Sequence, residues 1–214
     1  MDTENRLQVR GLSCIRQQNP LFAHLSFQLN PGEALLIEGQ NGSGKSSLLR
    51  LLTGLATSSA GEIFWRDQAI QDLRADYWDK LHYVGHMNGI KLGLTVTENL
   101  RLTAKLTSAR EVQQTEIESV LSLLQLSVCK NIPAKNLSAG QKRRIALAKL
   151  FLVPKTLWLL DEPLTALDAC TQSIFISQLE AHLQNGGIAV ISSHHALELK
   201  NDINVRTLRL EPSC

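Results

Sequence analysis

The sequence predicts an α/β fold with a helical insertion, because three patterns follow one another along the chain. Continuous apolar runs are typical of parallel strands that are covered on both faces. They occur at 34–37, 157–160 and 188–191. Segments 7–12 and 25–29 instead alternate apolar and polar residues, as half-buried strands do. The stretch 95–151 has a helical character, and this order of elements favours a layered α/β core.

Local signals predict the individual elements. We expect a turn at 30–32, a buried strand at 34–38, a helix at 46–55 and a strand at 62–65. Two capping boxes, Thr95 with Glu98 and Ser108 with Glu111, predict the starts of helices further along the chain.

Composition narrows the class of protein. Hydrophobic residues make up 43% and charged residues 20% of the 214, which is ordinary for one soluble globular domain. Lys and Arg total 22 against 20 for Asp and Glu, so the net charge of +2 gives no electrostatic case for a nucleic-acid partner. The short basic run 142–144 is interpreted as a solvated helix face.

Targeting and metal-binding patterns are not apparent in the sequence. Residues 1–10 are polar and charged without an apolar core, so we expect no signal peptide. Apolar stretches are only a few residues long, far short of the roughly 20 that span a bilayer. The four cysteines form no CxxC pair, so neither a zinc knuckle nor a dithiol motif is predicted.

One segment matches the phosphate-binding pattern G-x-x-x-x-G-K-[ST]. It is Gly39-Gln40-Asn41-Gly42-Ser43-Gly44-Lys45-Ser46, and the neighbouring Ser47 is included as a nucleotide contact. Glycines let successive backbone N–H groups turn toward phosphate oxygens, and the helix that follows adds its positive dipole end. Lys45 is expected to bind the β- and γ-phosphates of ATP, and the Ser46 hydroxyl to ligate Mg²⁺. The alternative, an ordinary glycine-rich turn, is disfavoured by the strand and helix on either side.

Two acidic residues, Asp161 and Glu162, directly follow the apolar run 157–160. Asp161 should emerge beside the phosphate-binding loop, where it would hold Mg²⁺ directly or through water. Glu162 is placed to polarise the attacking water as a general base. The alternative, an exposed acidic turn before Pro163, is less favoured once the loop is present upstream.

The segment 137–141, Leu-Ser-Ala-Gly-Gln, narrows the class further. Ser138 and Gly140 at a helix N-terminus form a small anion site with no obvious use for the nucleotide of their own chain, although a simple helix cap is the alternative. The segment resembles the signature motif of ABC ATPases, usually LSGGQ. The resemblance implies an ABC-type nucleotide-binding domain of the P-loop NTPase class, with a mainly parallel sheet core, an antiparallel β part and a helical subdomain.

The same resemblance implies that ATP is held between two copies of the chain. In the family, the signature of one subunit covers the γ-phosphate bound by the loop of the other. Ser138 and Gly140 would therefore contact the partner's nucleotide. The segment 166–168 is similar to the family's D-loop, which lies at the dimer seam, so Asp168 is included as a nucleotide contact.

His194 follows the apolar run 188–191, at the place where the family carries its switch histidine. A neutral imidazole there can hydrogen-bond the γ-phosphate and hold the attacking water together with Glu162. The resemblance thus implies a catalytic set of Lys45, Glu162 and His194.

Two positions depart from the family pattern. His86 aligns with a glutamine that usually contacts Mg²⁺, and an imidazole can still accept a hydrogen bond from metal-bound water. His82 lies four residues earlier, but Gly85 between them argues against a metal-binding helix. The aromatic residue that stacks on adenine is missing, and Arg16 lies near its place, where a guanidinium can stack on a base. Phe22 is the second candidate for that contact, with core packing as its alternative.

A finer resemblance is carried by several short segments together. They are 84–86, 89–91, 137–141, 158–163 and 186–188. The combination is similar to the CcmA family, the ATPase subunits of bacterial cytochrome c maturation, which are described as haem exporters. It implies a peripheral subunit on the cytoplasmic face of the bacterial inner membrane. Its partners would be the membrane proteins CcmB and CcmC, and hydrolysis would be linked to handing haem to the chaperone CcmE.

Two other functions remain open at this point: an ATPase subunit for a different transported substrate, and a soluble ABC ATPase that acts on DNA or ribosomes. The soluble kind usually carries two cassettes or a long coiled-coil insertion, and this chain has neither. We expect a single domain at 1–214, with its core at 1–85 and 155–214 and a helical subdomain at about 86–154.

Overall fold

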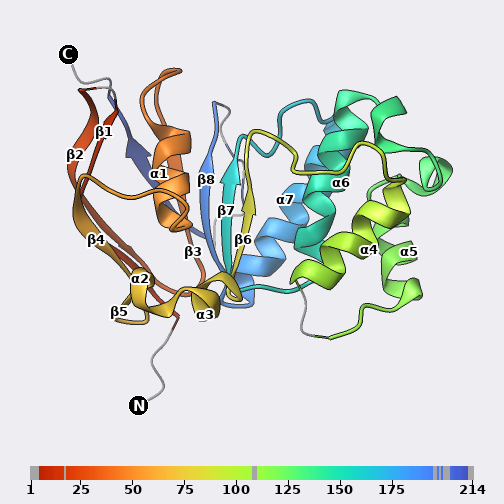
Figure 1. Cartoon of the computed structure of the whole chain (residues 1–214), viewed down its shortest axis with the longest axis horizontal. Coiled ribbons are helices and arrows are strands. Elements are labelled where there is room, and N and C mark those ends of the chain that lie inside the picture. The colour runs from red at the N-terminus through yellow and green to blue at the C-terminus, as the bar shows by residue number, and fades with distance from the viewer. Residues whose placement is uncertain are drawn as a thin grey trace.

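The computed structural model describes residues 5–16, 18–107, 110–194, 197, 199 and 203–211. Figure 1 shows two sheets with helix α1 between them, and a group of helices on the far side of the second sheet. The predicted α/β fold, with a parallel sheet, an antiparallel sheet and a helical part, is confirmed.

The first sheet is antiparallel, with the strand order β2-β1-β4-β5. Its strands are β1 (Leu7–Arg16), β2 (Asn19–Leu29), β4 (Ala60–Trp65) and β5 (Gln68–Ala69). Leu7 pairs with Leu29 on one side and with Trp65 on the other, and all three are buried. The alternating pattern at 7–12 therefore points its apolar residues to one face, as a half-buried sheet requires.

The second sheet is parallel, with the strand order β6-β7-β8-β3-β9. Its strands are β3 (Glu33–Glu38), β6 (Leu81–Val84), β7 (Leu157–Asp161), β8 (Ile188–Ser192) and β9 (Asn204–Arg209). Every residue of β7 and β8 is buried, because helices and the first sheet cover both faces. The prediction of buried parallel strands from continuous apolar runs is confirmed.

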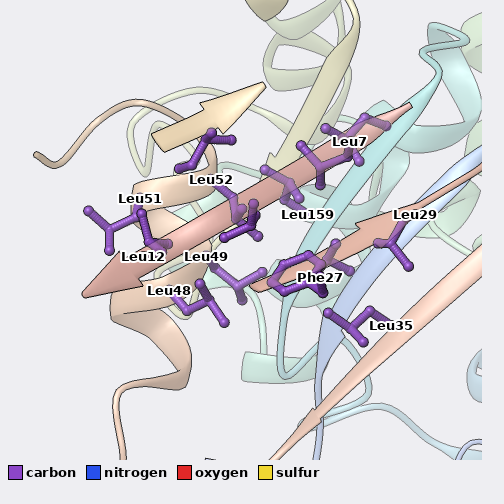
Figure 2. Packing of buried hydrophobic residues seen from close by; sticks show 14 of the residues in the cluster. Leu7, Leu12, Phe27, Leu29, Leu35, Leu48, Leu49, Leu51, Leu52 and Leu159 are labelled. Atoms are coloured by element: carbon purple, nitrogen blue, oxygen red, sulfur yellow. The ribbon is translucent and has the colours of Figure 1, made fainter. Parts of the chain in front are cut away.

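Helix α1 (Lys45–Leu52) packs between the two sheets. Its leucines meet Leu7, Leu12 and Phe27 of the antiparallel sheet and Leu159 of β7, as Figure 2 shows. The helix is shorter than the predicted 46–55, since Gly54 adopts a φ of 71° that ends the helical path.

The remaining helices are α2 (Ile70–Leu73), α3 (Ala75–Trp78), α4 (Val96–Thr107), α5 (Gln114–Leu123), α6 (Ala139–Leu152) and α7 (Ala169–Gln184), with 3₁₀ turns at Ser127–Cys129 and Ala134–Asn136. Helices α6 and α7 cover the other face of the parallel sheet, and α4 and α5 pack on α6. No helix in the described part of the chain is long and apolar enough to span a bilayer.

Of the two predicted helix starts, one is confirmed and one is wrong. The Glu98 carboxylate accepts from Thr95 N at 2.8 Å, and the Thr95 hydroxyl accepts from Glu98 N at 3.2 Å. Glu111 is not helical and Ser108 lies outside the described residues, while α5 begins at Gln114. A capping-box pattern is short enough to occur by chance outside a helix start.

Candidate active site

Four strands of the parallel sheet end at one edge, and the predicted site residues follow them. Loop 39–47 follows β3, the two acids end β7, His194 follows β8 and His86 follows β6. Because the carboxyl ends of parallel strands share an edge, the topology brings these segments together. In the open α/β folds this edge is where ligands bind.

Glycines and the Lys45 side chain shape the phosphate-binding loop. Gly42 and Gly44 have φ values of 88° and 99°, in the left-handed region that favours glycine. A Cβ at Gly39 would lie 2.4 Å from Leu210 O and 2.5 Å from Ser43 Oγ, so only glycine fits there. Lys45 is 7% exposed, and its Nζ donates to Gly39 O at 2.6 Å and Gln40 O at 3.1 Å. The Lys45 ammonium is therefore held against the carbonyls at the start of the loop.

Asp161 is buried at the end of β7, and a hydroxyl from the neighbouring strand holds it. Ser192 Oγ donates to Asp161 Oδ1 at 2.6 Å and accepts from Glu162 N at 3.1 Å. Glu162 N also donates to Ser192 O at 3.1 Å. One serine of β8 thus positions both acids.

Glu162 has a left-handed backbone, with a φ of 49°. Such a conformation is rare for a residue with a side chain and costs about 1–3 kcal/mol, so surrounding contacts must impose it. His194 Nε2 lies 3.1 Å from Glu162 Oε1. The two groups are not aligned as a hydrogen bond, and Oε1 is buried without a hydrogen-bond partner in the described part of the chain. Glu162 Oε1 is therefore an acceptor that remains available for a hydrogen bond from a water molecule.

Arg143 corrects the interpretation of run 142–144 as a solvated helix face. It is 4% exposed, and its guanidinium donates to five oxygens around the site. The acceptors are Gly85 O at 2.9 Å, Asn88 Oδ1 at 3.2 Å, Asp161 O and Glu162 O at 2.7 Å each, and Pro163 O at 3.3 Å. Burial lowers the pKa of Arg143, while the carboxylates of Asp161 and Glu162 oppose that shift.

Helical spacing could have revealed this burial. Arg143 lies three, four and seven residues before Ala146, Leu147 and Leu150, all buried against the parallel sheet. Positions so spaced share one face of a helix. Arg143 therefore shares the helical spacing of its buried neighbours, although its charge favours an exposed position.

The signature segment begins helix α6. Ser138 Oγ accepts from Gln141 N at 3.2 Å and Gln141 Oε1 accepts from Ser138 N at 2.9 Å, which is a complete capping box. Ser138 is exposed, and no hydrogen bond within the described residues joins it to loop 39–47. The helix start is therefore left facing outward, where a second molecule can reach it.

The D-loop segment lies against the signature of the same chain. A Cβ at Gly140 would come within 2.7 Å of Ala166 O, so the two backbones approach each other closely. Asp168 caps helix α7 through Thr171 N at 2.8 Å and forms an ion pair with Arg144 of α6. These contacts fix the D-loop to the helix that bears the signature.

The three candidates at the rim of the site differ in exposure. Arg16 is exposed at the end of β1. Phe22 is 7% exposed and contributes to the core beside Gly44, which supports core packing as its role. His86 is exposed after β6, whereas His82 is 2% exposed and lies 2.6 Å from Val153 O. The two histidines therefore do not form a metal site.

The residues present fit a nucleotide with a metal ion. Ser43 Oγ, like Glu162 Oε1, is buried without a hydrogen-bond partner in the described part of the chain. A Cβ at Gly42 would meet nothing within 4 Å, so the loop is open above this glycine. Ser46 and Asp161 carry oxygen atoms of the kind that Mg²⁺ prefers as ligands. The described residues contain no cluster of three or more His, Cys, Asp or Glu side chains that could hold a metal ion by itself.

Comparison with known proteins agrees with this geometry. The family described as ABC transporter matches residues 22–165. The cytochrome c biogenesis ATP-binding export protein CcmA of Methylococcus capsulatus is 45% identical over 196 residues, which cover 92% of this chain and 94% of that protein. The protein of the same name from Escherichia coli K12 is 41% identical over 193 residues, covering 90% and 91%.

Solved structures support the fold. An ATP-binding ABC transporter protein from Pyrococcus furiosus superposes with a TM-score of 0.79 at 23% identity, covering 96% of this chain and 97% of that one. An ATP-binding cassette solved as a dimer after hydrolysis, with ADP and phosphate bound, gives a TM-score of 0.78 at 22% identity, covering 88% of each chain. The chain therefore belongs to the ABC transporter family of ATP-binding proteins and, within it, to the CcmA group of cytochrome c biogenesis.

Proposed function

We propose that this chain is the ATP-hydrolysing subunit of an ABC membrane complex in cytochrome c biogenesis, coupled to haem export or to release of a haem-loaded chaperone. The observation that carries the proposal is the 40–45% identity to proteins named for that process, over most of the chain. The acid-ended strand and the phosphate-binding loop at one sheet edge supply the chemistry that such a subunit needs.

The loop binds the triphosphate. Backbone N–H groups of 39–47 and the dipole of α1 surround the phosphate oxygens, as is general for this motif. Lys45 moves its ammonium from the loop carbonyls to the β- and γ-phosphates, where its charge offsets theirs. Arg16 offers its guanidinium to the base.

Glu162 acts as the general base. Its carboxylate accepts a proton from the attacking water, and His194 at 3.1 Å orients that water and hydrogen-bonds the γ-phosphate. Mg²⁺, held by Ser46 and Asp161 with His86 beside it, would neutralise charge that develops on the phosphate oxygens. Ser192 keeps Asp161 in place for this role.

A second copy of the chain completes the site. The exposed start of α6, with Ser138 and Gly140, faces outward and can cover the γ-phosphate held by the other copy. Asp168 lies on the segment fixed to that helix, so it would reach the seam with the signature. Two such sites arise because a two-fold dimer repeats each contact.

The membrane partners are proposed to resemble CcmB and CcmC, with the chain bound peripherally at the cytoplasmic face of the bacterial inner membrane. The support is the family of the relatives, named as export proteins. The net charge of +2 favours no nucleic-acid partner.

The test is a pull-down of tagged Glu162→Gln protein from native membranes with ATP, since loss of the base should hold the ATP-bound complex together. Recovery of CcmB and CcmC homologues is the expected result. Lys45→Ala, which should bind ATP more weakly, is the matched control and should recover less of them. Recovery of an unrelated permease would overturn the cytochrome c role and leave the catalytic assignments intact.

A further inference from the structure

The guanidinium of Arg143 lies where three segments meet. Its helix, α6, begins with the signature, its Nη2 donates to the carbonyls that end β7, and its Nη1 donates to residues on both sides of His86. All of these acceptors are neutral oxygens, so the charge of a 4% exposed side chain is balanced only by dipoles and by carboxylates further away.

Three of the five acceptors are the consecutive carbonyls of 161–163. Successive carbonyls point in different directions along a strand, so the chain must curl for all three to face one group. The φ of 49° at Glu162 provides that curl. Glu162 O has a second donor in Thr165 N at 3.2 Å, which completes the tight turn.

A planar guanidinium suits this task better than any other cation. It presents five N–H groups in a rigid fork, so it can hold several carbonyls in one fixed arrangement. The turn that it holds directs the Glu162 carboxylate toward His194, 3.1 Å away. The alternative is a purely structural role, in which Arg143 attaches α6 to the sheet and has no influence on ATP hydrolysis.

We propose that Arg143 is a positioning residue for ATP hydrolysis. It holds the backbone of 161–163 so that the Glu162 carboxylate meets the attacking water. It also links that placement to helix α6, which begins with the signature, and to the loop that contains His86. The proposal rests on the role proposed above for Glu162. Arg143 has no hydrogen bond to loop 39–47 in the described part of the chain, so its effect should fall on turnover rather than on ATP binding.

The experiment measures kcat and KM for ATP in Arg143→Met and Arg143→Lys, beside Arg206→Met. Arg206 also donates to a backbone carbonyl, that of Gln28, but on β9 at the far edge of the sheet, so it is the matched control. We expect Arg143→Met to lower kcat about a hundredfold, with the KM for ATP within about threefold of the parent. Lysine keeps the charge without the fork, so Arg143→Lys should recover only part of the rate.

The same variants are then made in Glu162→Gln protein. If Arg143 acts through Glu162, Arg143→Met should lower the residual rate no further in that background. An additional hundredfold loss of rate in the Glu162→Gln background, or a parallel loss of ATP binding, would show that Arg143 has a structural role only and would overturn the proposal. Should the methionine variant fail to fold, Arg143→Lys in both backgrounds gives the same comparison.

The outcomes also separate this proposal from the proposed function. A normal rate in Arg143→Met and Arg143→Lys with an inactive Glu162→Gln would reject the positioning role and keep the general base. An active Glu162→Gln would reject the general base, and with it any action of Arg143 through that residue.

Discussion

The phosphate-binding loop and the acid-ended strand lie at the same sheet edge, but different kinds of contact hold them. The loop is shaped by its own glycines and by Lys45, which bonds to carbonyls five and six residues earlier. The strand end depends on Ser192 and Arg143, which reach it from β8 and α6. The hydrogen bonds that shape the loop are therefore local, whereas those that hold the strand end come from distant elements. Four substitutions would test this contrast.

The largest effect is expected for Lys45→Ala. ATP should bind about 10–100-fold more weakly, because a charge-assisted contact is worth about 1.5–3 kcal/mol, and turnover should fall below detection. Titration with a fluorescent ATP analogue and a phosphate-release assay measure the two quantities. Lys105→Ala at the end of α4 is the control, and normal turnover in Lys45→Ala would mean that the loop has been misassigned.

Glu162→Gln should lower kcat by about 10²–10⁴-fold, the usual contribution of a general base. ATP binding should persist, because the loop is not altered. Size-exclusion chromatography with ATP should then show a trapped dimer. A monomer under these conditions would count against an ATP-sandwiched pair.

Ser138→Arg should reduce hydrolysis about a hundredfold, since a bulky cation at the start of α6 would displace that helix from the other copy's nucleotide. ATP binding by the isolated monomer should be unchanged. Equilibrium binding at low protein concentration, where monomers dominate, is the measurement. A monomer that no longer binds ATP would show that the signature serves its own chain.

The smallest of the four effects is expected for Ser192→Ala. It removes two hydrogen bonds from the strand end, so kcat should fall about tenfold, as for one contact to a charged group, while the KM for ATP changes little. Ser119→Ala, which removes a hydroxyl bonded only within α5, is the matched control. An equal loss of ATP affinity would show that the two halves of the site are not held separately.

The same contrast explains what the sequence could reveal. The loop 39–46 is contiguous, so its pattern alone predicted its shape, and the apolar runs at β7 and β8 predicted buried parallel strands. The sequence does not predict the left-handed backbone of Glu162 or the hydroxyl of Ser192 beside Asp161. Both features depend partly on hydrogen bonds between residues that lie 30 or more positions apart in the chain. Arg143 differs for another reason: its charge favours a solvated face, whereas the helical spacing of its apolar neighbours favours burial.

The roles of Arg16, His86, Asp168 and the catalytic residues stay predictions. Arg16, His86 and Asp168 are all exposed. Asp168 differs from the other two in its contacts, because it forms an ion pair with Arg144 and caps helix α7 through Thr171 N.

Helix α1 is packed between two sheets, with Leu48, Leu49, Leu51 and Leu52 all buried. The loop that it carries is consequently ordered before a phosphate reaches it. Ordering a flexible loop on binding would cost conformational entropy for each residue immobilised. A loop fixed in advance avoids most of that loss, so more of its interaction with a triphosphate can appear as affinity.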